Sequence, residues 1–506
     1  MIPMFHADFQ DLVNDERIHR VLFLILIGTY VYSEAKSWWN SLLRPLYVKI
    51  TSTLSDYRSG KFYKPWGPTT PIVIVSTKKQ IAELSEAPCL SQRAVYADMF
   101  GFKHTMNKLE HNTSNNKVIR TRLYSRLLQV NGPVHLDGLY PHLLNRFDIN
   151  LERELRGGRV LNGESRILDI PEVSIILTWK LGGISLPIAQ TARRLVSNLM
   201  GLMFFGEALS SDEEFSSALL RYPQDMVKCM AAFQVAPSLV HAVLTNRGEA
   251  MHLIQKRLFQ CIQSGLSNQS EGDKIQRHTI LYNIIALTSG SEYWNADLLS
   301  QSLLGIWFAA SHQPWMNLHF VILELCARKE WQSKLRQEIE QHVPLDYKDL
   351  EQLPLLDGFI KETVRCNPLD TLAIRRKALE PYTFSDGSLS VPSGATVCVS
   401  SYDLMHNPQT YPDPNAFNPS RYLPKEPNSQ QLKFTEVSEA YPIWGYGSLA
   451  CPGRFQASLA MKLVISQLLL KYDLSLENKN ARTKWSWETF AMPYKSTRVI
   501  LKEHGL

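Results

Sequence analysis

The sequence lacks the features that would make the protein fibrous, disordered or polytopic. It contains no internal repeat and no long low-complexity linker, and its apolar fraction of 44% is close to the roughly 45–50% of globular chains. A mean hydropathy of −0.17 excludes a polytopic membrane protein. The length of 506 residues suits about three ordinary domains or one large enzyme.

Cysteine and excess charge are both scarce. The seven cysteines are odd in number and widely scattered, which indicates a reducing compartment and favours at least one cysteine being kept for chemistry. The net charge of +6 is a mild excess over the whole length. Nucleic-acid binding usually needs a clustered basic stripe, so we expect no nucleic-acid partner.

The one membrane-directed segment, Val21–Tyr32 (VLFLILIGTYVY), is shorter than the roughly 20 residues that span a bilayer. Arg20 precedes it, and Trp38 and Trp39 follow at positions that suit a membrane interface. We expect an uncleaved anchor. A buried core helix and a cleaved signal peptide are the alternatives, although no cleavage site or cysteine-rich secreted domain is evident.

Helical periodicity dominates, with a minor β component, which predicts a mainly α (α+β) fold. Residues 402–450 form a long stretch that is rich in Pro, Asn and Tyr and poor in periodicity. Long loops in compact domains tend to be functional. The main predicted elements are a long apolar helix over 298–328, a charged helix over 331–342, helices over 355–366 and 454–472, and strands over 72–75 and 396–399.

The irregular stretch ends in Trp444-Gly-Tyr-Gly-Ser-Leu-Ala-Cys451-Pro-Gly-Arg. Gly445 and Gly447 permit backbone conformations closed to other residues and leave space for a flat group. Cys451 lies where the helix from Arg454 begins, and the positive end of a helix favours a thiolate. A thiolate on such a loop suits an iron ligand, and backbone N–H groups would tune the sulfur. A structural cysteine in a tight turn is the alternative.

This segment resembles the haem-binding signature of the cytochrome P-450 family, the haem-thiolate monooxygenases. The resemblance implies haem b as cofactor and Cys451 as the iron ligand. It also implies the family fold, with a long central helix over the haem and the cysteine loop and C-terminal helix beneath it. Where the family usually has a basic residue that contacts a haem propionate, this chain has Leu449. The matching positions are Trp444, Gly445, Gly447, Cys451 and Gly453.

Two further motifs stand in the family's order before the cysteine. Glu362 and Arg365 are three residues apart on a predicted helix, which places both side chains on one face. Arg421 follows in a Pro-x-Arg segment, and a second arginine reaching Glu362 would complete a hydrogen-bonded charge triad. The resemblance implies that this triad is structural and holds the irregular loop below the haem.

The resemblance also indicates which arginines would contact the haem propionates. Arg120 stands where the family has such an arginine, although the tryptophan usual four residues earlier is Asn116 here. Arg376 is preferred over Arg375 as the second, by its spacing to the strand at 382–384. Solvated surface arginines are the alternative at both places.

The oxygen-activating segment departs most from the family pattern. The family's acid–threonine pair is His312 and Gln313 here, followed by Pro314, which should kink the helix. Histidine can relay protons near neutral pH, and Gln313 can hold a water, so both are expected to be catalytic. A hydrogen-bonded core histidine is the alternative for His312, and Ser311 is a further candidate hydroxyl at the wrong position for the usual geometry.

We therefore expect an anchor and linker over 1–50 and a catalytic domain over 51–506 on the cytosolic face of the endoplasmic reticulum membrane. The resemblance implies electrons from an NADPH–cytochrome reductase and a lipophilic substrate such as a terpenoid, alkaloid or polyketide of fungal secondary metabolism. The alternatives are an isomerase or dehydratase of the same fold, and a non-catalytic haem protein. Segment 231–244 is the candidate entry, and the expected apolar pocket residues are Trp307, Phe308, Ala309, Leu372 and Ala373.

Overall fold

The computed structural model describes residues 61–62, 70–100, 133–161, 183–235, 249–264, 275–290, 294–424, 432–487 and 489–505. The expected anchor Val21–Tyr32 and the expected propionate ligand Arg120 lie outside these residues, as does the division at residue 50. Within the described part of the chain, no helix is long and apolar enough to cross a membrane.

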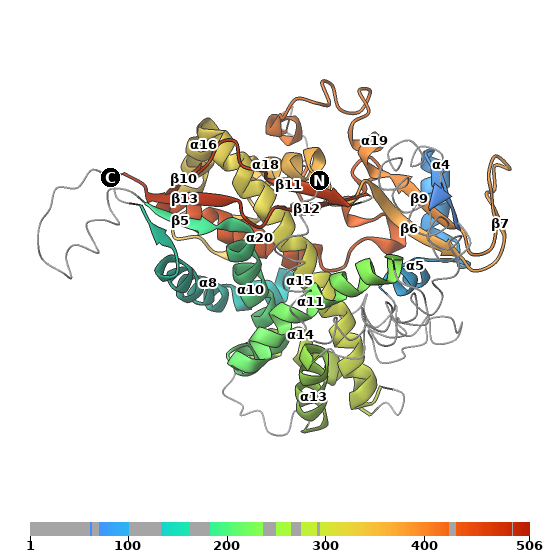
Figure 1. Cartoon of the computed structure of the whole chain (residues 1–506), viewed down its shortest axis with the longest axis horizontal. Coiled ribbons are helices and arrows are strands. Elements are labelled where there is room, and N and C mark those ends of the chain that lie inside the picture. Colours follow the sequence, from blue (N-terminus) through green and yellow to red (C-terminus); the bar gives the residue numbers. More distant parts are fainter. Residues whose placement is uncertain are drawn as a thin grey trace, which may run out of the picture.

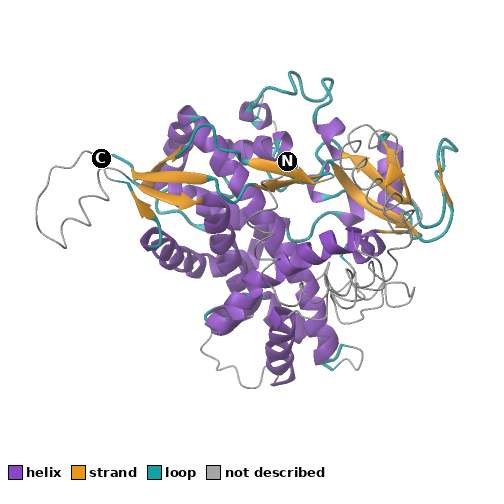
Figure 2. Cartoon of the chain, in the orientation of Figure 1, coloured by secondary structure: helices purple, strands orange, loops and turns teal. Residues whose placement is uncertain are grey.

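Helices make up most of the body, and the small sheets lie on its left and right with the β11–β12 hairpin between them (Figures 1 and 2). The amino-terminal helices are α4 (Lys78–Glu86), α5 (Gln92–Met99), α8 (Pro133–Arg156), α10 (Ile188–Ser210), α11 (Glu213–Val235), α13 (Glu249–Ser264) and α14 (Ile280–Thr288). The later helices are α15 (Ala296–Ala327), α16 (Lys329–Glu340), α17 (Tyr347–Leu350), α18 (Pro354–Cys366), α19 (Ser401–Met405) and α20 (Arg454–Lys471). The mainly α fold with a minor β component is confirmed.

The long predicted helix is α15, which runs through the centre of the body. It begins where the Asn295 side chain accepts a hydrogen bond from the Leu298 backbone N–H. It continues through Pro314 without leaving the helical conformation. Its neighbours hold that segment in place, since α10 crosses it at the Phe204–Trp307 ring contact and α11 through the bond from Trp307 Nε1 to the Leu219 carbonyl.

Two sheets flank the helices. The larger has the order β1-β2-β9-β6-β3, in which only β2 and β9 run parallel among its described pairs. Its strands are Lys61–Phe62, Thr70–Val75, Thr396–Ser400, Leu372–Ala378 and Leu90–Ser91, in that order. The second has the order β10-β13-β5-β4 and is formed by Tyr472–Leu476, Arg498–Glu503, Ile184–Pro187 and Arg159–Val160. The hairpins are β7–β8 (Tyr382–Thr383 and Ser390–Val391) and β11–β12 (Lys484–Trp487 and Phe490–Pro493).

One main apolar core joins α8, α10, α15, α18 and α20, and a smaller cluster lies under the larger sheet. Helix α20 is buried along almost its whole length, which explains why its sequence is apolar on all sides. In its described residues, the predicted irregular stretch holds only short elements, namely α19 and the 3-10 turns η4 (Pro419–Tyr422), η5 (Pro442–Trp444) and η6 (Gly447–Leu449). The cysteine loop thus leads from this irregular stretch directly into the buried helix α20.

Candidate active site

The cysteine loop is a closed turn built on two glycines. Gly445 and Gly447 have φ of +78° and +58°, in the left-handed region that favours glycine. A Cβ at Gly445 would lie 2.5 Å from the Leu449 carbonyl oxygen, so no other residue fits there. The Cys451 backbone N–H donates to the Trp444 carbonyl and closes the loop.

Cys451 lies half-buried, three residues before α20 begins. Burial is the largest influence and raises the pKa of its thiol, whereas a hydrogen bond from the Gly453 backbone and the charge of Arg454 lower it. The sequence analysis predicted the two influences that favour a thiolate, the helix start and a backbone N–H, but did not consider the opposing effect of burial. In this setting, a thiolate would be stabilised by a bound cation, which the metal ion of a haem provides.

Trp444 anchors the start of the cysteine loop to Phe434. Its indole Nε1–H donates to the Phe434 carbonyl at 2.6 Å, and its ring meets the Phe434 ring edge-on with centroids 5.0 Å apart. With only 8% of its surface exposed, Trp444 supports the backbone on which Cys451 sits.

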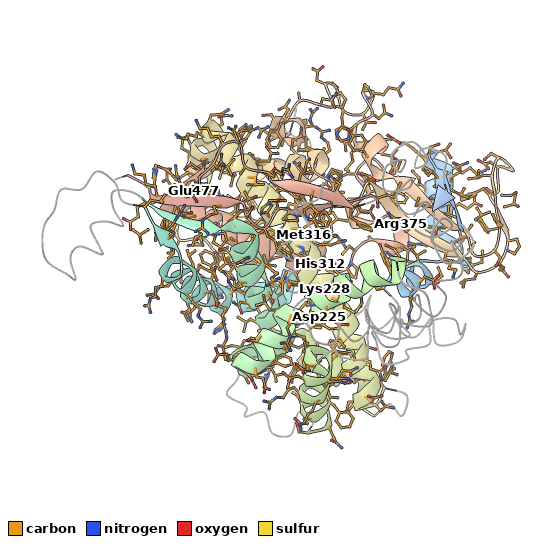
Figure 3. All side chains as sticks on the ribbon, viewed as in Figure 1. Asp225, Lys228, His312, Met316, Arg375 and Glu477 are labelled. Atoms are coloured by element: carbon orange, nitrogen blue, oxygen red, sulfur yellow. The ribbon has the colours of Figure 1, made fainter. Side chains whose placement is uncertain are left out.

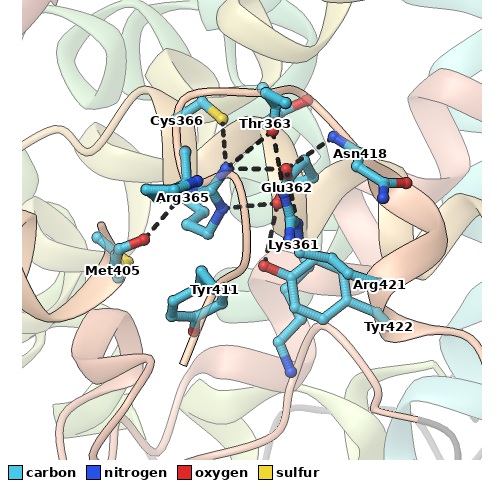
Figure 4. A network of polar contacts seen from close by, with 12 residues as sticks. Lys361, Glu362, Thr363, Arg365, Cys366, Met405, Tyr411, Asn418, Arg421 and Tyr422 are labelled. Carbon is cyan, nitrogen blue, oxygen red and sulfur yellow. Dashed lines mark hydrogen bonds and ion pairs between the residues drawn. The ribbon is translucent and has the colours of Figure 1, made fainter. Parts of the chain in front are cut away.

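The predicted charge triad is confirmed (Figure 4). Glu362 is fully buried and accepts from Arg365 Nε at 2.7 Å and Nη2 at 2.9 Å, and from Arg421 Nε at 3.1 Å. The Asn418 backbone N–H and the Tyr422 hydroxyl complete its partners, at 2.8 and 3.2 Å. The triad therefore fixes α18 to the irregular loop, as the resemblance implied.

A second buried charge cluster, which the sequence analysis missed, holds the same region. Lys462 of α20 is fully buried and contacts Asp357 at 3.0 Å and Glu351 at 3.3 Å. Asp357 also accepts from the Phe434 backbone N–H at 3.1 Å, next to the contact that holds Trp444. The only sequence signal was a lysine, Lys462, in the middle of a mostly apolar helix.

One face of α15 is open, although the helix lies in the core. Ala309 and Gln313 are exposed, and Ile306 and Ala310 are partly exposed beside them. Their spacing of three and four residues places all four on one side of the helix. Among the described residues, then, the middle of α15 is left uncovered at the segment predicted to activate oxygen.

His312 lies on the flank of that open face, near the middle of the molecule (Figure 3). Its ring stacks on Phe308 with centroids 5.6 Å apart and meets Trp315 edge-on, while Phe308 contacts Phe100. Burial, followed by the nearby Arg193 charge, lowers the pKa of His312 to about 4, so the ring is neutral at pH 7.

The two neighbouring arginines of β6 have different surroundings. Arg375 donates to Asp370 at 3.0 and 2.8 Å and to the Thr489 hydroxyl at 2.7 Å. Arg376 is 1% exposed, and among the described residues it donates to the Arg375 carbonyl alone and has no partner for its buried Nε. Burial lowers the pKa of Arg376 to about 10, which leaves it charged at pH 7. An unpaired buried guanidinium fits a carboxylate of a bound haem.

The expected pocket residues are only partly placed as predicted. Trp307 is wrong as a pocket residue, because it is fully buried between α10 and α11 against Phe204 and Phe205. Leu372 is buried, whereas Ala309 is exposed and Phe308 and Ala373 are partly exposed. Of the candidate entry segment 231–244, the structure describes only 231–235, which form the end of α11.

A family model of cytochrome P-450 matches residues 180–501. The chain belongs to the cytochrome P-450 family. It is accordingly a haem-containing oxidoreductase of the monooxygenase class, with the P-450 fold.

Similar curated proteins are fungal. The chain is 28% identical to terQ of Tolypocladium album over 82% of this chain and 76% of that protein. It is 30% identical to ausG of Penicillium brasilianum over 58% of this chain and 57% of that protein. It is 27% identical to paxQ of Penicillium paxilli over 63% of this chain and 64% of that protein. All three are named cytochrome P-450 monooxygenases. The alignments with ausG and paxQ therefore span less than two thirds of the length of those relatives.

A solved structure shares the fold. The retinoic-acid-bound cyanobacterial CYP120A1 superposes with a TM-score of 0.63 at 18% identity, over 86% of this chain and 90% of that one.

Proposed function

We propose that the protein is a haem-thiolate monooxygenase that hydroxylates a lipophilic small molecule of fungal secondary metabolism, in one or several steps. One observation carries the proposal: Cys451 sits half-buried at the start of α20, on a loop that two left-handed glycines shape and buried charges brace. The names of the fungal relatives support the reaction class. A terpenoid, alkaloid or polyketide intermediate is the proposed substrate.

Cys451 would bind the haem iron, and Arg376 would bind a haem carboxylate. Trp444, Gly445 and Gly453 act through the loop, since the first supports it, the second permits its turn and the third donates a backbone hydrogen bond to the sulfur. Arg120 is the second proposed carboxylate ligand. The bound haem supplies the oxygen-activating chemistry, with the thiolate increasing the electron density on its iron.

His312 and Gln313 are the proposed proton-handling residues. A neutral imidazole both donates and accepts a hydrogen bond, so His312 can pass a proton between two waters without holding a charge. Gln313, exposed on the open face of α15, can hold one such water with its amide. Together they would replace the acid and the alcohol that the family usually has there.

Apolar side chains would hold the substrate. Ala309 leaves room on the open face of α15, and the Phe308–Phe100 pair, with ring centroids 4.8 Å apart, supplies an apolar wall next to His312. Such a wall favours a substrate without charge at the reacting carbon.

The cellular setting follows from the same proposal. Val21–Tyr32 would anchor the protein to the endoplasmic reticulum membrane, with the catalytic domain over 51–506 in the cytosol. An NADPH–cytochrome reductase would supply the electrons. Expression of the full chain fused to a fluorescent reporter, with and without residues 1–50, tests the anchor by membrane fractionation: recovery of both forms in the soluble fraction contradicts it.

The experiment that tests the function combines the purified full chain, reductase and NADPH with a panel of lipophilic candidate substrates. Substrate-dependent consumption of NADPH and O₂, with a product heavier by one oxygen, supports the proposal. Product formation without NADPH would instead indicate an isomerase or dehydratase. Failure of every substrate to change NADPH or O₂ consumption would indicate a non-catalytic haem protein.

A further inference from the structure

Three of the described helices contain a proline beyond their first turn, and each of these prolines removes one hydrogen bond from its helix. A proline has no backbone N–H, so the carbonyl four residues earlier loses its helical partner, and the ring pushes that carbonyl aside. The prolines are Pro141 in α8, Pro223 in α11 and Pro314 in α15. The carbonyls that they leave are those of Asp137, Leu219 and Ala310, respectively.

Two of these three carbonyls find a donor in another way. The Leu219 carbonyl accepts from Trp307 Nε1 at 2.9 Å, so an indole of α15 replaces the N–H that Pro223 lacks. Asp137 is exposed at the surface, where water can donate to its carbonyl. The fold therefore compensates for a helix proline by a side chain where the carbonyl is inside the protein and by solvent where it is outside.

The Ala310 carbonyl differs from the other two, because no side chain of the described residues donates to it. The hydroxyl of Ser311, its neighbour along the chain, donates instead to the Trp307 carbonyl at 2.7 Å. Ala310 is partly exposed and belongs to the open face of α15, with Ile306 one turn before it and Gln313 one turn after it. A backbone acceptor is therefore left available on the open face, at the segment predicted to activate oxygen.

We propose that the Ala310 carbonyl accepts a hydrogen bond from the substrate, which therefore carries a hydroxyl or N–H group on an otherwise apolar skeleton. This inference rests on the proposed function, whose substrate it specifies. The side chains of Ile306 and Ala309 on the same face are apolar. A wholly apolar molecule placed against them would bury the carbonyl without a donor, which is unfavourable, whereas a hydroxyl or N–H would pair with it. One directed bond on an apolar surface also fixes the orientation of the bound molecule.

Pro314→Ala tests this inference, because alanine restores a backbone N–H at residue 314. That N–H bonds the Ala310 carbonyl within the helix and competes with the substrate for it. The variant should fold, with an unfolding midpoint equal to that of the wild type or higher, since alanine favours a helix and proline opposes it.

The measurement is the dissociation constant of two rigid probes, obtained from the change in the ferric Soret band of the haem-loaded full chain. One probe is 1-adamantanol, which has a hydroxyl donor, and the other is 1-methoxyadamantane, which keeps the oxygen but has no donor. Pro314→Ala should bind 1-adamantanol several-fold to roughly tenfold more weakly than the wild type, the effect of one hydrogen bond. It should bind 1-methoxyadamantane as the wild type does.

Pro223→Ala is the matched control, because it restores an N–H opposite a carbonyl that Trp307 already bonds, and it should alter neither dissociation constant. An equal loss of affinity for both probes in Pro314→Ala overturns the inference, since a change in pocket shape does not distinguish a donor from its ether. Unchanged affinity for both probes also overturns it and leaves the Ala310 carbonyl to water. The thiolate-type absorption band should persist in Pro314→Ala, and its absence from the wild type would contradict the proposed function instead.

Discussion

Arg365 donates two hydrogen bonds, of 2.7 and 2.9 Å, to the Glu362 carboxylate, and neither side chain is exposed to solvent. An ion pair at this spacing on the exposed face of a helix contributes little to the stability of the fold. Here it is part of the support that α18 gives to the described loop leading to Cys451, because Arg365 also donates to the carbonyls of Met405 and Pro414.

Glu362→Gln should therefore destabilise the protein strongly. It leaves the buried Arg365 guanidinium and the partly buried Arg421 guanidinium without their carboxylate, and the loss at a buried pair costs about 3 to 5 kcal/mol. We expect loss of bound haem together with a lower unfolding midpoint, measured by the Soret absorbance during thermal denaturation. Asp148→Asn is the control, because it removes an exposed ion pair to Lys471 and should change stability by less than about 1 kcal/mol. Equal midpoints for the two variants would contradict the structural role of the triad.

Lys462→Met should also destabilise the protein, because it leaves the buried Asp357 carboxylate without its cation. We expect a loss of about 3 kcal/mol in urea unfolding. Adding Asp357→Asn removes the buried negative charge while keeping an acceptor for the Phe434 N–H, so the double variant should recover part of the loss. A double variant that is as unstable as the sum of both single variants would show that the two groups are not coupled.

Several of these features could be predicted from the sequence and others could not. The glycines and Cys451, the Glu362–Arg365 spacing and the apolar length of α15 are local patterns, and each appears in the structure as predicted. The Lys462–Asp357 pair and the packing of Trp307 against Phe204 and Phe205 of α10 depend on how distant segments pack. Nothing in a single helix's periodicity states which of its apolar faces meets a neighbour and which remains open.

Acid should destabilise the fold through buried neutral histidines. Burial lowers the pKa of His312 and of His319 to about 4, below the value of about 6.5 in an unfolded chain. Between these values the unfolded chain binds protons that the folded protein does not, so stability falls as pH is lowered from about 6.5 toward 4. His319, which is fully buried, should account for up to about 3 kcal/mol of this change.

The measurement is urea unfolding at pH 7 and pH 5 for the wild type and His319→Gln. The free energy of unfolding of the variant should change less between pH 7 and pH 5 than that of the wild type, whatever the stability of the variant at pH 7. An unchanged difference would mean that His319 titrates normally in the folded protein.

Gln313→Ala should uncouple electron use from product formation if Gln313 holds the water that delivers protons. We expect NADPH consumption to continue while product per NADPH falls several-fold and peroxide rises. His312→Phe, which keeps the ring stacking on Phe308 but removes both ring nitrogens, should have the same effect. The control is His406→Phe, because the His406 ring also stacks on an aromatic ring, that of Tyr402, but lies at the end of α19 and not on α15. Unchanged coupling in Gln313→Ala would remove it from the proton path.

The central claim is that the Cys451 sulfur binds the haem iron as a thiolate. The most direct measurement is the absorption difference spectrum of the dithionite-reduced, carbon-monoxide-bound protein, compared between the wild type and Cys451→Ser. We predict the long-wavelength thiolate band in the wild type and its complete loss in the variant, with Cys366→Ser retaining it. A thiolate band that persists in Cys451→Ser would contradict the account.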